Sequence, residues 1–153
     1  MLAAKGFGQG DPVSEATDAM RRALRAIVVP RLRALGFDGA FPHFRRVRDG
    51  VHETLMFQFD KYGHGFFLEA GSAAADEFLA LQREWEAAGA ALPASKFTVA
   101  HCAPHRRGRL GGLRAHPGAN HRFAFTAGDG EEVARRVADV VDAQVEAHFA
   151  TAR

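Results

Sequence analysis

The chain has 153 residues, of which 47% are hydrophobic and 25% are charged, and it carries a formal net charge of +2. This length fits one domain with its own core, and so small a charge does not by itself predict nucleic-acid binding. The single cysteine excludes an intrachain disulfide, and no apolar run reaches the roughly 20 residues of a membrane span, so we expect a soluble, cytoplasmic protein without a membrane partner.

The first predicted element is an N-terminal helix. Residues 1–11 are small and Gly-rich and are expected to form a flexible tail, which leaves 12–153 as a single domain. Apolar residues then recur at helical spacing up to Leu35, and Gly36 is the expected end of the helix. Pro30 removes one main-chain hydrogen bond from this stretch, so we expect a kink there rather than two helices.

The segment 41–71 predicts a three-stranded antiparallel meander. Asp49-Gly50 is favoured in a type I′ hairpin turn, because both central residues of that turn need a positive φ. Counting back from the turn places Arg46 opposite Glu53. A second reversal at 60–65 continues one apolar face, on which we expect the helices to pack. The core side chains predicted for that face are Phe44, Leu55, Phe57, Phe66 and Leu68.

The opposite face of the meander mixes apolar and polar side chains. Its predicted members include Val47, Met56 and Phe67 among Arg45, His52, Gln58 and Glu69. Such a face is either an interaction surface for another chain or a surface covered by one of the helices.

The remainder of the chain predicts two strands and two helices. Ser72 is a candidate N-cap for a helix that reaches about Ala88, and Asp129 caps a C-terminal helix with a valine-rich stripe. Lys96–Cys102 and Asn120–Thr126 alternate as short strands, whereas 103–119 fits no element. The predicted fold is therefore α+β, an antiparallel sheet of about five strands (the meander plus two) with N-terminal, connecting and C-terminal helices.

Several segments, taken in their order along the chain, resemble one protein family. The matching segments are Leu32–Phe37, Phe44–Arg46, Phe57–Lys61, Phe66–Gly71 and, after Cys102, Arg107–Leu113. Their order and spacing are similar to those of the bacterial domain-of-unknown-function family DUF4304. The resemblance covers most of 13–149 and implies an α+β domain, but it brings no activity, cofactor or catalytic residue to carry over.

Basic side chains gather in the segment 101–122, which has five arginines, four histidines and no acid. A guanidinium group donates two parallel hydrogen bonds to a carboxylate or phosphate, and nearby glycines would let main-chain amides approach the same anion. The candidate anion-binding residues are Arg106, Arg107, Arg109, Arg114 and Arg122. The alternative is a solvated loop whose arginines pair with acids of this chain.

Cys102 and the neighbouring histidines suggest two further hypotheses. The spacing of Cys102, His105, His116 and His121 is similar to that of a zinc finger with one cysteine replaced, and Cys102 beside a histidine would make a nucleophile. Structural zinc sites favour paired cysteines, however, and a lone cysteine is more often a buried hydrophobe. We therefore predict no metal, no cofactor and no catalytic residue. Lys61 and Tyr62, at the tip of the second hairpin, are candidate contact residues.

The function predicted from the sequence is a non-enzymatic binding or protein-interaction module, whose partner is another protein or a small anionic ligand. One alternative is an anion or nucleic-acid binder acting through 106–122. Nucleic acid is the less favoured ligand, because the segment lacks interleaved aromatic residues and a phosphate-binding motif. The other alternative is a small enzyme that uses Cys102, so the sequence leaves enzymatic activity open.

Overall fold

The computed structural model describes residues 12–111 and 121–151. Its helices are α2 (Pro12–Ile27), α3 (Val29–Ala34), α4 (Ala75–Ala87) and α5 (Gly130–Thr151). Its strands are β1 (Asp38–Ala40), β2 (His43–Arg48), β3 (Val51–Phe59), β4 (Gly65–Ala73), β5 (Arg107–Leu110) and β6 (Phe123–Ala124). Single turns of 3-10 helix follow α4: η1 (Ala94–Lys96), η2 (Val99–His101) and η3 (Pro104–Arg106). The predicted tail lies outside the described residues.

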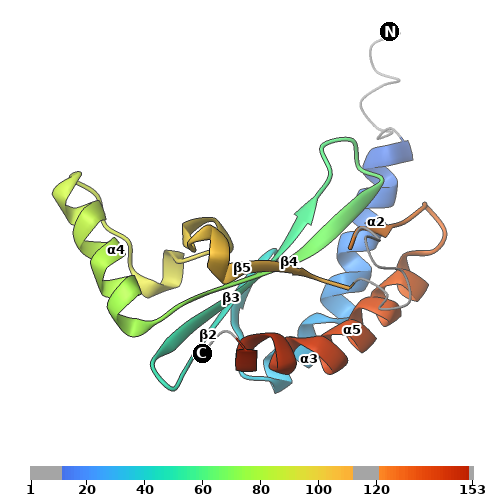
Figure 1. The fold of residues 1–153 in the computed structure, drawn as a ribbon. Coiled ribbons are helices and arrows are strands. Elements are labelled where there is room, and N and C mark those ends of the chain that lie inside the picture. Colours follow the sequence, from blue (N-terminus) through green and yellow to red (C-terminus); the bar gives the residue numbers. More distant parts are fainter. Residues whose placement is uncertain (1–11, 112–120, 152–153) are drawn as a thin grey trace, which may run out of the picture.

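The strands form one antiparallel sheet in the order β1-β2-β3-β4-β5, and β6 also pairs with β4 (Figure 1). The register of the meander is the predicted one, with Phe44 opposite Leu55 and Arg46 opposite Glu53. The turn residue Asp49 has a φ of 53°, and Gly50 has a φ of 77°, as a type I′ turn requires. The α+β prediction is confirmed.

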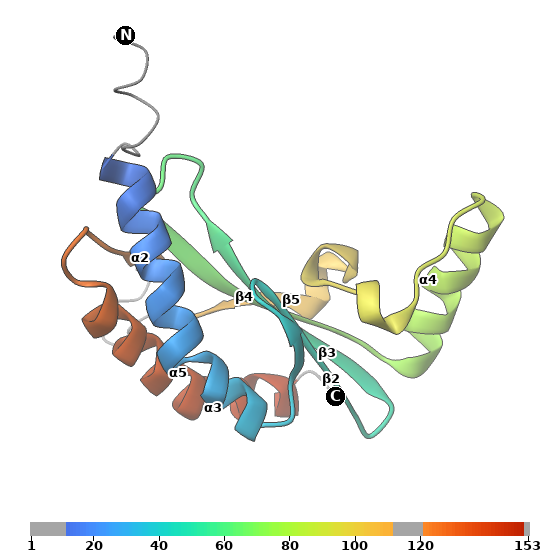
Figure 2. The ribbon, with the colours of Figure 1, turned by 180° about the vertical axis from the view of Figure 1, so that it is seen from behind.

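Helices α2, α3 and α5 lie together on one face of the sheet and enclose the main core (Figure 2). The apolar stripes of α2 and α5 contribute Met20 and Val141, both fully buried. They pack against the five predicted core side chains of the meander, all of which are at most 2% exposed. In the part of the chain that the structure describes, none of the helices is long and apolar enough to cross a membrane.

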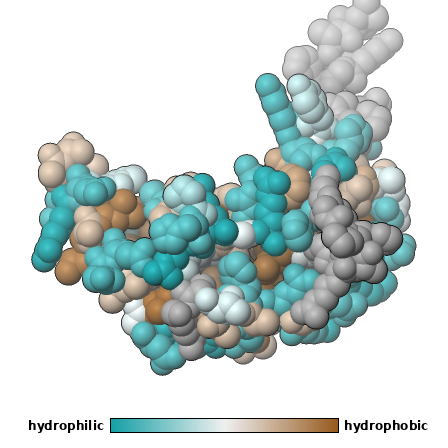
Figure 3. All heavy atoms as spheres, in the orientation of Figure 1, coloured by the Kyte–Doolittle hydropathy of each residue, from teal (hydrophilic) through white to brown (hydrophobic). Residues whose placement is uncertain are grey.

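The other face of the sheet carries a smaller cluster under α4 and the 3-10 turns. Its buried members are Ala73, Phe78, Leu92, Phe97 and Cys102. Helix α4 projects away from the sheet (Figure 1), and hydrophobic and hydrophilic residues are interspersed over its surface (Figure 3). The expectation that the helices pack on the face bearing Phe44 was therefore wrong for α4.

The boundaries of two predicted helices were also wrong. The chain from 12 to 35 is divided at Val28 into α2 and α3, because Pro30 has no amide to donate to residue 26. The division is local, since Val28 still donates to the carbonyl of Leu24 at 2.9 Å. Ser72 does not cap α4, because it lies in β4, where it pairs with Glu53 of β3. The N-cap of α4 is Ala74.

The second half of the sheet differs from the prediction as well. Lys96–Cys102 is not a strand, because it contains the end of η1 and all of η2. In η2 the main-chain amide of Thr98 donates to Nδ1 of His101 at 3.0 Å, which closes a turn instead of a sheet pairing. The fifth predicted strand shortens to β6, and β5 forms in the segment to which no element was assigned.

Candidate functional site

The predicted anion-binding arginines that the structure describes contact different parts of the chain. Arg106 forms an ion pair with Glu77 of α4, Arg109 with Glu69 of β4, and Arg122 with Asp60 of the β3–β4 loop. Arg107 donates to the carbonyls of Cys102 and Ala100, each at 2.8 Å, and Arg114 lies outside the described residues. These contacts favour the alternative of arginines that pair within this chain, and an anion-binding role stays a prediction.

Cys102 has the surroundings of a packed side chain. It is 3% exposed, and its Sγ lies 3.8 Å from Oγ1 of Thr54 and 3.7 Å from the carbonyl of Thr98. Burial raises the pKa of the thiol, which disfavours the reactive thiolate. Of the four residues with zinc-finger-like spacing, His116 is not described, and within the described ranges no cluster of potential ligands is arranged to hold a metal.

The candidate contact residues Lys61 and Tyr62 lie at the tip of the β3–β4 hairpin. Tyr62 is 73% exposed, and Nζ of Lys61 lies 6.0 Å from the centroid of its ring. The hairpin tip is held against α2, because Oγ1 of Thr17 donates to the carbonyl of Gly63 at 3.3 Å. Their contact role also stays a prediction.

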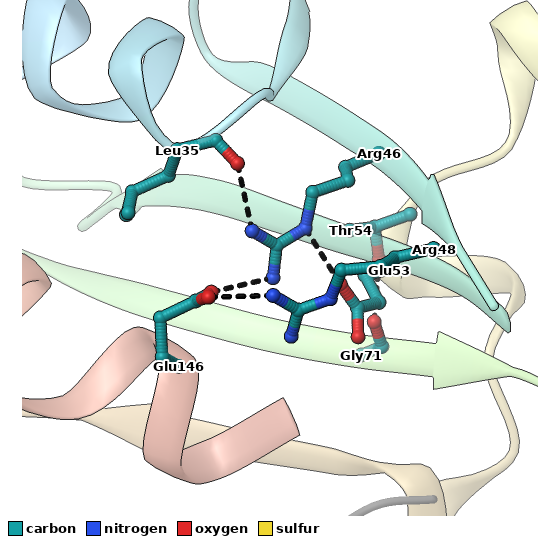
Figure 4. A network of polar contacts seen from close by, with 7 residues as sticks. All are labelled: Leu35, Arg46, Arg48, Glu53, Thr54, Gly71 and Glu146. Carbon is teal, nitrogen blue, oxygen red and sulfur yellow. Dashed lines mark hydrogen bonds and ion pairs between the residues drawn. The ribbon is translucent and has the colours of Figure 1, made fainter. Parts of the chain in front are cut away.

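A buried polar network joins the β2–β3 hairpin to the helical layer (Figure 4). Glu53 is fully buried, and its Oε1 accepts a hydrogen bond of 2.7 Å from Nε of Arg46. The same guanidinium group donates to the carbonyl of Leu35 at 2.8 Å and to Oε1 of Glu146 at 2.7 Å. Arg48 donates to the other oxygen of Glu146 at 2.5 Å.

The network is balanced in charge and serves to position the hairpin. It holds two arginines and two glutamates, and the ring of Phe37 lies 4.3 Å from Cζ of Arg46. Burial works against ionisation of Glu146, but the hydrogen bonds from Arg46 and Arg48 lower the pKa of that carboxyl overall. The hairpin is therefore fixed to α5 from the core side, and its other side faces α4 and the segment that contains η1.

That other side carries a recess of about 280 Å³ between the hairpin and η1. The side chains and main chain that line it belong to Asp38, Arg45, Arg46, Val47, His52, Glu53, Thr54, Ala94, Ser95 and Phe97. Its accessible walls are mostly apolar. Three of these residues, Arg45, Val47 and His52, belong to the outward face that the sequence offered as an interaction surface.

The walls of the recess are held by stacking and by main-chain contacts. The ring of His52 stacks on Phe78 of α4 at 3.9 Å and meets the edge of Phe97 at 6.0 Å. Nε of Arg45 donates to the carbonyl of Phe97 at 3.4 Å. Within the described ranges Arg45 forms no ion pair, and Asp38, its cross-strand neighbour in β1, lines the same recess.

Three histidines on this face share a lowered affinity for protons. Burial lowers the pKa of His52, and it is also the main cause of the lowered pKa of His43 and His101. The positive charge of Arg45 adds to the effect at His43, and that of Arg107 adds to it at His101. These lowered pKa values favour the neutral imidazole rings. The charged residues that line the recess are Arg45, Arg46 and Glu53 of the network and Asp38 of β1.

The edge of β2 next to the recess is open at Val47. Strand β1 pairs with β2 only at 43–45. The amide of Phe57 donates to the carbonyl of Pro42, which directly precedes β2. In an antiparallel pair alternate residues direct their main-chain groups to the same neighbour, so residues 44, 46 and 48 face β3. Val47 falls in the other set, and in the described structure its N–H and C=O have no partner. Its side chain is 60% exposed.

Part of this site was beyond sequence reasoning. The outward position of Val47 follows from the hairpin register, but Ala94, Ser95 and Phe97 come from a segment that was predicted partly as a strand. The one sequence feature that indicates an open edge is the length of β2, because β2 continues to Arg48 whereas its pairing with β1 ends at Arg45.

Comparison with known proteins gives a family. The sequence model of DUF4304, a domain of unknown function, matches residues 28–151. Curated proteins and solved structures gave no significant match. The matched range contains every strand described above, the buried network and all the residues that line the recess. The chain therefore belongs to the DUF4304 family of domains of unknown function.

Proposed function

We propose that this domain is a non-enzymatic protein-interaction module that binds an extended segment of another protein beside β2. The observation that carries the proposal is the main-chain edge at Val47, which has no partner among the described residues and borders the recess. We further propose that it acts in the bacterial cytoplasm, where a lone buried thiol such as that of Cys102 stays reduced.

Strand addition explains how the edge and the recess would act together. A segment laid beside β2 in line with β1 exchanges hydrogen bonds with the N–H and C=O of Val47. The residue opposite Val47 directs its side chain to the same face of the sheet, which is the face that holds the recess. One partner residue therefore supplies both the main-chain pairing and the side chain that is buried.

The recess selects the class of that side chain. Its 280 Å³ lies just below the range of about 300–1,000 Å³ that is usual for small-molecule sites, so it suits a single side chain better than a cofactor. The mostly apolar walls, with Phe97 and Val47 among them, favour an aliphatic residue. Arg45 favours an acidic residue next to it in the partner.

The expected affinity is low. Two hydrogen bonds contribute about 0.5–1.5 kcal/mol each, and burial of one aliphatic side chain contributes about 1.5–3 kcal/mol. Association itself costs at least about 4 kcal/mol, so the recess alone supports only transient binding. A stable complex needs contacts elsewhere on the domain.

Selection from a random peptide library tests the proposal, with multivalent display to compensate for the low affinity. Val47→Pro removes the N–H at the open edge of β2, where proline is tolerated because no partner strand needs that donor. Val47→Thr is the matched control, because it keeps this N–H. Ala94→Trp is designed to fill the recess, because Ala94 is an exposed residue of η1 that lines it. We expect the native domain and Val47→Thr to enrich peptides with an aliphatic residue beside an acid. Val47→Pro and Ala94→Trp should not enrich them.

Two outcomes overturn the proposal. One is that the native domain enriches no peptides above an unrelated control domain. The other is that Val47→Pro and Ala94→Trp, folded by circular dichroism, enrich the same peptides as the native domain.

A further inference from the structure

A second surface, independent of the recess, lies along the seam between α2 and the sheet. Cζ of Arg21 lies 4.8 Å from the centroid of the Phe59 ring, and Cζ of Arg25 lies 4.9 Å from that of Phe41. Lys61 borders the same surface depression as Arg21. We name the residues Lys61, Arg21 and Arg25 the basic row.

The rings beneath the basic row are continuous. The centroids of Phe41 and Phe59 are 6.3 Å apart, and each ring carries one guanidinium group. Arg33 of α3 extends the line, with its Cζ 5.5 Å from the ring of Phe44. Arg33 also donates to the carbonyls of Phe37 and Gly39, so it covers the outer edge of β1.

The cations of the basic row form no ion pairs with the acids that the structure describes. Within the described ranges neither Arg21, Arg25 nor Lys61 forms an ion pair, whereas Arg106, Arg109 and Arg122 all do. Asp18 borders the depression and forms no ion pair with any described residue, and Asp60, which borders it too, forms an ion pair with Arg122.

The aromatic rings give these arginines a defined orientation. A guanidinium group over a ring buries one face and keeps its N–H groups available for a carboxylate fork. Arg21 and Arg25 are four residues apart in α2, which is a rise of about 6 Å. Alternate residues of an extended chain are about 6.6 Å apart, so two carboxylates at such positions can meet both arginines.

We propose that the basic row is a docking surface for an acidic segment of a partner protein. Two observations favour carboxylates over a nucleic acid. The ring faces that would stack on bases are already covered by guanidinium groups. The row offers few cations in a chain whose net charge is only +2, so few phosphates can be neutralised.

Fluorescence anisotropy with a labelled oligoglutamate peptide tests this surface. The test variant combines Arg21→Gln, Arg25→Gln and Lys61→Gln. The control combines Arg83→Gln, Arg135→Gln and Arg136→Gln, which removes the same charge from exposed positions of α4 and α5. At an ionic strength of about 0.01 M, we expect the test variant to weaken binding about tenfold and the control to weaken it less than about twofold.

A measurement on the unmodified protein keeps the test decisive if the triple variant does not fold. Oligoglutamate should shift the NMR signals of the Nε–H groups of Arg21 and Arg25, but not that of Arg83. Equal weakening by both triple variants, or equal shifts at Arg21 and Arg83, overturns the proposal. If oligothymidylate of the same length binds more tightly than oligoglutamate, the surface is assigned to nucleic acid, and this result also overturns the proposal.

Discussion

Replacing Glu53 by Ala removes the most deeply buried charge of the network, and its cost can be worked out from the contacts. The carboxylate is fully buried and lies 2.7 Å from Nε of Arg46, which is itself 7% exposed. Removing one partner of a buried ion pair costs about 3–5 kcal/mol, because the other charge stays buried. Arg46 would keep Glu146 and the carbonyl of Leu35, so we expect the low end, about 3 kcal/mol.

Urea unfolding with linear extrapolation measures this change in the free energy of unfolding. The control is Asp142→Ala, which breaks the ion pair with Arg31, where both side chains are 49% exposed, and should cost about 0–1 kcal/mol. The double variant Arg46→Met with Glu53→Leu should recover most of the loss, because no buried charge remains. A cost for Glu53→Ala no larger than that for Asp142→Ala would refute the reasoning.

Three further predictions concern the cores and the titrating groups. Phe57→Ala should lower the free energy of unfolding by about 3–5 kcal/mol, whereas a change within about 0.5 kcal/mol would place Phe57 on the surface. Cys102 should react slowly with a thiol reagent in the folded protein and rapidly in urea; equal rates would contradict its burial. Burial lowers the pKa of His43, His52, His101 and His148 below the ordinary 6.5, so the unfolded chain takes up protons that the folded chain does not. The free energy of unfolding should therefore fall as the pH drops from about 7.5 to about 5.5, and a rise over this range would contradict those shifts.

The meander could be predicted in detail because local rules determine it. Asp49-Gly50 fixes the turn, and strict alternation then assigns Phe44 and Leu55 to the core face. The same alternation assigns Arg45, Val47 and His52 to the outward face, so three of the ten residues that line the recess were visible in the sequence. Glu53 and Arg46 were predicted as a cross-strand pair, but their burial depends on α5, which brings Glu146 to them.

The remaining differences arise from tertiary contacts. Strand β5 contains Gly108, where a Cβ would lie 2.9 Å from the ring of His148, so this strand depends on close approach to α5 rather than on strand propensity. The far wall of the recess depends on Phe97, whose ring packs against Phe78 at 5.1 Å. Arg21 and Arg25 are recognisable in the sequence as residues of a helix. Their contacts with Phe59 and Phe41 could not be predicted, because those rings come from distant segments of the chain.

Amide hydrogen exchange at Val47 tests strand addition most directly. Among the described residues this N–H has no partner in the free domain, so it should exchange as rapidly as amides outside regular structure. Binding of a selected peptide should protect the Val47 amide, while the amide of Phe44, which already pairs within the sheet, should change little. A Val47 amide that is already protected in the free domain, or that stays unprotected when the peptide is bound, would contradict binding at this edge.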